Sequence, residues 1–190
     1  MSKIYDQFVK RLGEEVAKIK VGPGEDNFRM GPVSSERAFK SIMKYIEIGK
    51  KENKLLYGGD IAPGNGFYIQ PTIFIDVKPK DTLAQEEVFG PVLAVIKAET
   101  FENAIEIQND TKYGLTGALY SKNPKKWEYA KLHFHCGNLY GNRKCTGALV
   151  GVHPFGGFNL SGTDSKAGGR DYLLLFLQAK ATALKEGTFA

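Results

Sequence analysis

Apolar positions recur every three or four residues in two segments near the start of the chain. From Ile4 to Ile19 they form a single stripe, and Gly22-Pro23-Gly24 interrupts the pattern. A second stripe follows Ser34-Ser35, a candidate helix N-cap, and ends near Gly49. Apolar residues at this period are typical of a helix with one buried face, and serine is a preferred N-cap residue. The sequence therefore predicts two amphipathic helices.

The pattern then changes to short β-branched and aromatic runs. Leu55–Tyr57 predicts a short strand, and Tyr68–Val77 predicts a longer one in which Pro71 marks either a sheet edge or a break. Further along, strands and helices alternate, and the apolar run at 92–98 is typical of a buried parallel strand. This alternation predicts an α/β fold, an open and mostly parallel twisted sheet with flanking helices. The alternating elements are Val92–Ala98, Phe101–Asn109, Leu115–Tyr120, Pro124–Phe134 and Asn138–Asn142.

The last third of the chain has a different character. Seven glycines fall between Gly147 and Gly169, too many for the interior of a helix or strand. A flexible linker is one interpretation, but His153-Pro154-Phe155 and Phe158 favour an ordered functional loop whose backbone approaches another group closely. After it, Tyr172–Ala179 is apolar on both faces, which predicts a strand that is sandwiched or pairs with another chain.

Composition and charge narrow the class of protein. The chain has 190 residues, 42% hydrophobic and 25% charged, as expected for a soluble globular domain. Its formal charge of +5 comes from lysines scattered among acidic residues, which indicates solvated helix faces more than a nucleic-acid or other interaction surface. No apolar stretch reaches the ~18 residues of a membrane span, and the N-terminus lacks a signal-peptide core. We therefore expect a cytoplasmic protein with neither nucleic acid nor membrane as a partner.

The two cysteines give little sign of metal chemistry. Cys136 and Cys145 lack CxxC spacing, which favours a reducing compartment. Zinc binding by His133, His135 and Cys136 is a weak alternative, because the spacing suits no tetrahedral site and a fourth ligand is not evident. We expect no metal site.

Three motifs resemble those of aldehyde dehydrogenases, in the same order and with the same spacing. They are Gln85–Pro91 (QEEVFGP), Gly114–Tyr120 (GLTGALY) and Pro154–Thr163 (PFGGFNLSGT). A fourth stretch, Gly137–Gly151 (GNLYGNRKCTGALVG), is similar to the corresponding segment of 1-pyrroline-5-carboxylate dehydrogenases, as are Thr163–Gly169 (TDSKAGG) and the closing DYLLLFLQAK. Gly141 departs from that pattern, which has a larger residue there, and the glycine is expected to loosen the strand.

The resemblance implies NAD-dependent oxidation of glutamate γ-semialdehyde to glutamate, a step of proline degradation. It implies that Glu87 binds the nicotinamide ribose, where a carboxylate accepts from two hydroxyls, and that Phe89 lies against the nicotinamide ring. The backbone N–H groups of Thr146-Gly147-Ala148 would bind the substrate's α-carboxylate, with Phe155 along its aliphatic stem. Without the resemblance, each of these residues has a structural interpretation instead. Glu87 would be a solvated loop residue, Phe89 would belong to the core, and Phe155 would only anchor its loop.

The family also needs a cysteine thiolate, a general base and oxyanion donors. The resemblance places this cysteine in a Gly-Gln-x-Cys segment shortly before the helix at Ile4, so no catalytic residue is assigned here, and neither Cys136 nor Cys145 is expected to replace it. We expect residues 1–170 to be a portion of the catalytic domain without the nucleophile segment, and 171–190 to be an oligomerisation strand and tail.

Two functional hypotheses follow. The first is a truncated or split 1-pyrroline-5-carboxylate dehydrogenase, inactive alone, whose N-terminal half would be a separately encoded partner. The second is a non-catalytic oligomerisation or partner-binding module that assembles through Leu173–Lys180. An independent binder of glutamate-like carboxylates has less support.

Overall fold

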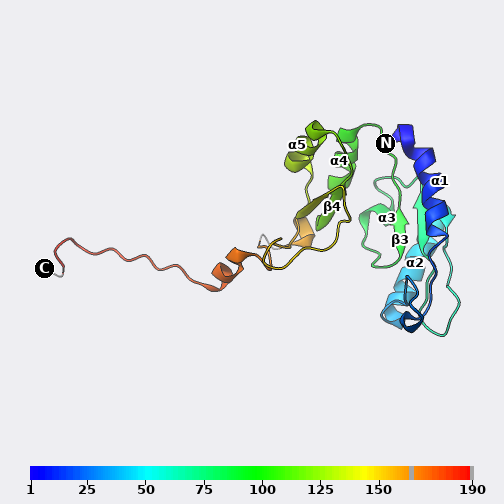
Figure 1. Cartoon of the computed structure of the whole chain (residues 1–190), viewed down its shortest axis with the longest axis horizontal. Helices are drawn as coiled ribbons and strands as arrows, with labels where there is room; N and C mark the ends of the chain where they lie inside the picture. Colours follow the sequence, from blue (N-terminus) through cyan, green and yellow to red (C-terminus); the bar gives the residue numbers. More distant parts are fainter. Residues whose placement is uncertain (163–164, 189–190) are drawn as a thin grey trace. The chain divides into compact units, whose positions relative to one another are not determined.

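A computed structural model describes residues 1–162 and 165–188. Thr163 and Asp164, which belong to two of the motifs, lie outside the described residues. The chain divides into two compact units, Met1–Thr111 and Lys112–Ala190, each of which has its own sheet (Figure 1). The sequence suggested a different division, into a catalytic-domain portion (1–170) and an oligomerisation strand with its tail (171–190). That division stays a prediction.

The first unit contains both predicted amphipathic helices. The side chain of Ser35 accepts a hydrogen bond from the backbone N–H of Ala38 at 3.2 Å, which confirms the predicted N-cap. The predicted helix at 101–109 is also confirmed, with Thr100 as its cap. The elements of this unit are α1 (Tyr5–Val16), α2 (Glu36–Glu52), β1 (Lys54–Tyr57), β2 (Thr72–Ile75), α3 (Thr82–Gln85), β3 (Val92–Ala94) and α4 (Phe101–Asn109), with 3₁₀ turns at Ser2–Ile4 and Gly24–Asp26.

The sheet of the first unit has the order β1-β2-β3. Strand β2 pairs with β3 in parallel, as expected, but with β1 antiparallel. Pro71 marks a break, because β2 begins at the next residue, whereas the alternative of a sheet edge is wrong, because β2 is the central strand. Strand β3 ends at Ala94, earlier than predicted, and Leu93 is 47% exposed. The full burial expected for this run is therefore not observed within the unit.

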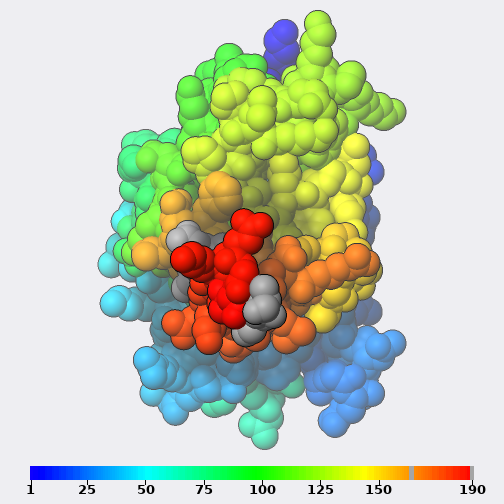
Figure 2. Space-filling model, turned by 90° about the vertical axis from the view of Figure 1, so that its left-hand side faces the viewer, coloured from blue at the N-terminus to red at the C-terminus, as the bar shows by residue number. Residues whose placement is uncertain are grey.

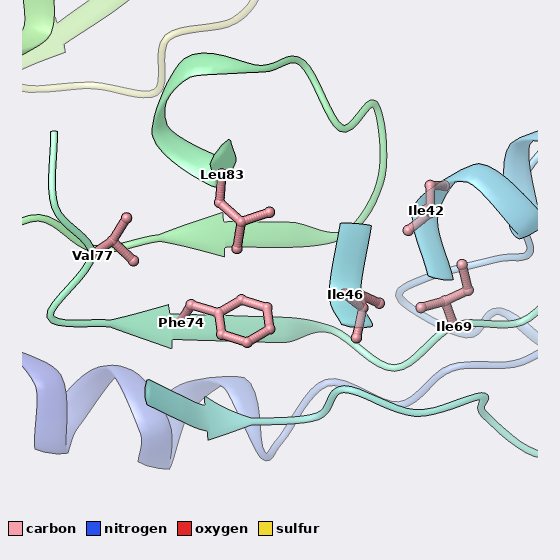
Figure 3. Close-up of a cluster of buried hydrophobic side chains, with 6 residues drawn as sticks. All are labelled: Ile42, Ile46, Ile69, Phe74, Val77 and Leu83. Carbon is pink, nitrogen blue, oxygen red and sulfur yellow. The ribbon is translucent and has the colours of Figure 1, made fainter. Parts of the chain in front are cut away.

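Strand β2 lies between two hydrophobic cores and contributes side chains to both. Its residues alternate in direction, so Ile73 and Ile75 pack with Tyr5, Val9 and Val16, three buried residues of α1. Phe74 points to the opposite face, where it joins a cluster built mainly from α2 and the segment around α3 (Figure 3). The sheet is thus enclosed between α1 and α2. The members of the second cluster are Ile42, Ile46, Ile69, Phe74, Val77 and Leu83.

The second unit contains a β-α-β crossover, as predicted. Strands β4 (Thr116–Leu119) and β5 (Asn138–Gly141) are parallel, and α5 (Pro124–His133) connects them. Helix α5 begins at Pro124, where the missing N–H leaves no bond unmade. Strand β5 extends through Gly141, so the expected loosening is not observed. A side chain at 141 would place its Cβ 2.9 Å from the Trp127 ring, and the glycine therefore gives this tryptophan of α5 its space.

The strand predicted over Tyr172–Ala179 is not formed within the described chain. Arg170–Phe176 is a 3₁₀ helix, and residue 177 begins an extended segment that pairs with no described strand. A strand needs a neighbour for its backbone hydrogen bonds, and sequence patterning alone does not supply one. The side chains stay exposed, with Leu173 and Phe176 each 72% accessible, and Figure 2 draws the segment in orange to red.

No helix in the described part of the chain is long and apolar enough to cross a bilayer. The same residues contain no cluster of three or more His, Cys, Asp or Glu side chains suited to a metal ion, and the His133–Cys136 stretch forms none.

Candidate substrate pocket and cofactor contact

The second unit contains a pocket of about 580 Å³. All four residues that the sequence assigned to the substrate lie around it, so the structure brings them together from the two sides of the Gly-rich loop. Strand β5 contributes a further side chain that sequence reasoning missed, although the two-residue alternation of a strand could have indicated it. The residues that matter here are Tyr140, Thr146, Gly147, Ala148, His153 and Phe155.

The base of the Gly-rich loop is held by close backbone contacts. Phe155 and Ala167 exchange two backbone hydrogen bonds, of 2.8 and 2.9 Å. The amine of Lys166 donates to the carbonyl oxygens of Gly137 and Gly156, at 2.5 and 2.7 Å, and thereby joins the start of β5 to the loop. These contacts favour a held loop over a flexible linker for the described residues around 155 and 167, and they fix the backbone of Phe155, whose side chain is 40% exposed beside the pocket.

The turn at the pocket wall presents backbone donors. Gly147 has a φ of +85°, a conformation that residues with a side chain rarely adopt. The N–H of Leu149 donates to Nδ1 of His153 at 3.1 Å, whereas the N–H groups of Gly147 and Ala148 have no acceptor among the described residues. Two adjacent unpaired N–H groups beside a pocket form a site that an anion such as a carboxylate can occupy.

The predicted cofactor contacts lie in the first unit, between α3 and β3. The two glutamates of the motif differ, because Glu86 accepts a 2.6 Å hydrogen bond from the hydroxyl of Tyr45. Glu87 is exposed, and no described residue bonds to its carboxylate, which leaves both oxygens available to the hydroxyls of a ribose. Phe89 is 86% exposed with a φ of +55°, so its ring is not part of the core. The alternative of a core ring is therefore wrong for Phe89, whereas the exposed carboxylate of Glu87 fits both a cofactor contact and a solvated loop residue.

The two cysteines differ in their surroundings, and Cys136 does not have those of a nucleophile. Burial raises the pKa of the Cys136 thiol to about 11, although the positive charge of Lys166 partly opposes this effect. At neutral pH the thiol is therefore almost entirely protonated, and the thiolate is the reactive form. Cys145 is an exposed residue at the rim of the pocket, next to the turn that presents the donors.

Comparison with known proteins agrees with this geometry. The model of the aldehyde dehydrogenase family matches residues 1–182. The chain therefore belongs to the aldehyde dehydrogenase family.

Several relatives at more than 50% identity are named 1-pyrroline-5-carboxylate dehydrogenase. The chain is 55% identical over 184 residues to a 1-pyrroline-5-carboxylate dehydrogenase of Anoxybacillus flavithermus, covering 96% of this chain and 36% of that protein. It is also 55% identical to one of Bacillus subtilis, over 95% of this chain and 35% of the relative. A crystal structure of 1-pyrroline-5-carboxylate dehydrogenase from Thermus with bound NAD matches with a TM-score of 0.91 at 50% identity, over 94% of this chain and 34% of that one. The chain thus spans about a third of the length of the curated relatives it matches.

Proposed function

We propose that these 190 residues supply the carboxylate-binding pocket and a nicotinamide-ribose contact of an NAD-dependent aldehyde dehydrogenase, located in the cytoplasm, that oxidises glutamate γ-semialdehyde to glutamate. The observation that carries the proposal is the pocket, where the free N–H groups of Gly147 and Ala148 lie beside Phe155. The N–H groups bind the α-carboxylate, and the aromatic ring packs against the aliphatic stem. This arrangement selects an amino-acid semialdehyde over a plain aldehyde.

NAD accepts the hydride in the chemistry proposed for the full enzyme. In this chain, Glu87 accepts hydrogen bonds from the ribose hydroxyls and Phe89 lies against the nicotinamide ring. The exposed, unengaged carboxylate and the exposed ring fit these roles. Charge-assisted hydrogen bonds of the Glu87 kind are roughly twice as strong as neutral ones.

Binding of L-glutamate to the purified chain tests the proposed carboxylate site. The amides of Gly147 and Ala148 should shift in ¹⁵N NMR spectra, with a dissociation constant in roughly the millimolar range for two charge-assisted bonds. Gly147→Ala should weaken binding about tenfold, because a residue with a side chain disfavours the φ of +85° and turns the donors away.

Gly151→Ala is the matched control for that variant. Gly151 has a similar φ of +79°, an added Cβ there would meet no atom within 4 Å, and its N–H is already bonded to Gly168. It carries the same backbone strain outside the proposed site and should leave glutamate affinity within about twofold. Equal losses in the two variants would contradict the assignment of Gly147.

We expect no NADH formation when the purified chain is mixed with NAD and pyrroline-5-carboxylate, because the thiol of Cys136 is buried and protonated and Cys145 lies at the carboxylate end of the pocket. Addition of a polypeptide that carries the Gly-Gln-x-Cys segment, the separately encoded partner proposed for this chain, should restore turnover. Turnover by the chain alone that Cys136→Ser or Cys145→Ser abolishes would show that one of these thiols is the nucleophile.

A second candidate function is assembly, and the exposed apolar run at the C-terminus favours it. Leu173, Leu174, Leu175, Phe176 and Leu177 are all more than half exposed, which is costly in an isolated chain. We expect analytical ultracentrifugation to show a dimer or larger assembly through Leu173–Lys180, and the double variant Leu173→Glu, Phe176→Glu to be monomeric. A wild-type chain that sediments only as a monomer would contradict this function.

A further inference from the structure

Arg143 makes two contacts that the proposed function does not use. Its Nη2 atom donates to the carbonyl oxygen of Thr146 at 3.1 Å. Its guanidinium carbon lies 5.3 Å from the ring centroid of Tyr140, a cation–π contact. Tyr140 is only 7% exposed, so the guanidinium rests on a fixed ring of β5 and bonds to the turn from there.

The geometry of the peptide bond connects this contact to the carboxylate site. The Thr146 carbonyl and the Gly147 N–H belong to one planar trans peptide, in which the two bonds point in opposite directions. When the guanidinium holds the carbonyl, it also fixes the direction of the N–H, which points away from Arg143. A hydrogen bond to the carbonyl polarises the same peptide and makes its N–H a stronger donor.

The same peptide belongs to the wall of the pocket. Thr146, Gly147 and Ala148 line it, whereas Arg143 is not one of its lining residues. At the far end of the turn, His153 engages the N–H of Leu149 at 3.1 Å. The two side chains therefore hold the turn on both sides of Gly147 and Ala148, whose N–H groups have no acceptor in the described part of the chain.

We propose that Arg143 is a positioning residue for the carboxylate site: it holds the Thr146 carbonyl so that the Gly147 N–H faces the pocket. This inference rests on the proposed function of the Gly147 and Ala148 donors. Lysine does not substitute for arginine in this role, because an ammonium lacks the planar group that rests on the Tyr140 ring while one nitrogen reaches the carbonyl.

The test uses the ¹⁵N-labelled chain with two variants of Arg143 and one control. Arg143→Met removes the charge and the donors, whereas Arg143→Lys keeps the charge and N–H donors but lacks the planar guanidinium. The control, Lys144→Met, removes a neighbouring exposed cation that has no hydrogen bond or ion pair with the described residues. The Gly147 amide resonance of the free chain and the dissociation constant for L-glutamate are both measured, and the amides of β5 report whether each variant is folded.

In both Arg143 variants the Gly147 resonance should move before any ligand is added, and glutamate should bind about tenfold more weakly. Lys144→Met should move neither the resonance nor the affinity by more than about twofold. Wild-type affinity in Arg143→Lys would show that an ammonium serves as well as the planar guanidinium, and an equal loss in Lys144→Met would show that the net charge of the turn matters instead. Either result would overturn the proposal.

The two hypotheses fail in different ways. If the wild-type chain does not bind glutamate, the proposed carboxylate site is wrong in this chain, and the positioning role is still decided by the Gly147 resonance in the free variants. If glutamate binds but Arg143→Met leaves that resonance in place, the positioning role is wrong and the carboxylate site stands.

Discussion

Replacing Gly137 with alanine is expected to lower the stability of the second unit by about 3 kcal/mol or more and to abolish glutamate binding. An added Cβ at this position would lie 1.6 Å from the carbonyl oxygen of Gly156 and 2.5 Å from its carbonyl carbon. Both atoms are backbone, so no side-chain rotation relieves the clash. The loop must separate from β5, and the bond from Lys166 to the Gly137 carbonyl is lost with it.

Urea unfolding followed by tryptophan fluorescence measures this effect, because Trp127 is the one tryptophan of the chain and lies in α5 of the same unit. The control is Gly31→Ala in the first unit, where an added Cβ would meet no atom within 4 Å. The control should unfold within about 0.5 kcal/mol of the wild type. A Gly137→Ala chain as stable as this control would show that the loop does not approach β5 as described.

Truncation of Phe74 to alanine is expected to destabilise the first unit by about 3–5 kcal/mol. The ring is fully buried at the centre of β2 and packs with Ile46 and Leu83 from two other elements, so its removal leaves a cavity in the core (Figure 3). A typical domain is stable by only about 5–15 kcal/mol, and the variant should therefore lose a large part of its helical signal at moderate urea.

Far-ultraviolet circular dichroism during urea unfolding measures this loss, since α1 and α2 both belong to the first unit. Phe89→Ala is the control, because the same substitution at an 86% exposed ring should cost under about 0.5 kcal/mol. Because Phe89 is assigned to the nicotinamide contact, its removal should affect that contact and leave the stability of the unit unchanged. A cost below about 1 kcal/mol for Phe74→Ala would contradict the packing described for β2.

Local chemistry explains which parts of the fold could be predicted from the sequence. The cap at Ser35 and the proline that begins α5 depend on neighbouring residues alone, and both were predicted correctly. For Pro71 the sequence left a sheet edge and a break open, and only the break is observed. The antiparallel pairing of β1 with β2 was missed because the residues of a short strand do not specify the direction of the strand beside it. The pattern at 172–179 specifies an apolar segment, but whether such a segment is a strand depends on a neighbouring strand.

The candidate site likewise contains residues that could be predicted from the sequence and residues that could not. The resemblance of the segment around Gly147 to the dehydrogenase motif implied the backbone donors, and the structure adds that Gly147 has a positive φ. Neither Tyr140 nor Arg143 was assigned to the site, since their contribution is the stacking of one on the other and a hydrogen bond across the turn. Such contacts become visible only when β5 and the turn are placed in space.

The double contact of Lys166 has a consequence for affinity. One ammonium group bonds to residues 137 and 156, which are the two ends of the segment that contains the pocket turn. A segment whose ends are tied has few conformations left to lose when a ligand arrives, so less of the interaction energy is consumed in ordering it. Acetylation of this lysine would neutralise the ammonium and leave a single N–H donor, and we expect glutamate to bind such a chain with a larger entropic penalty.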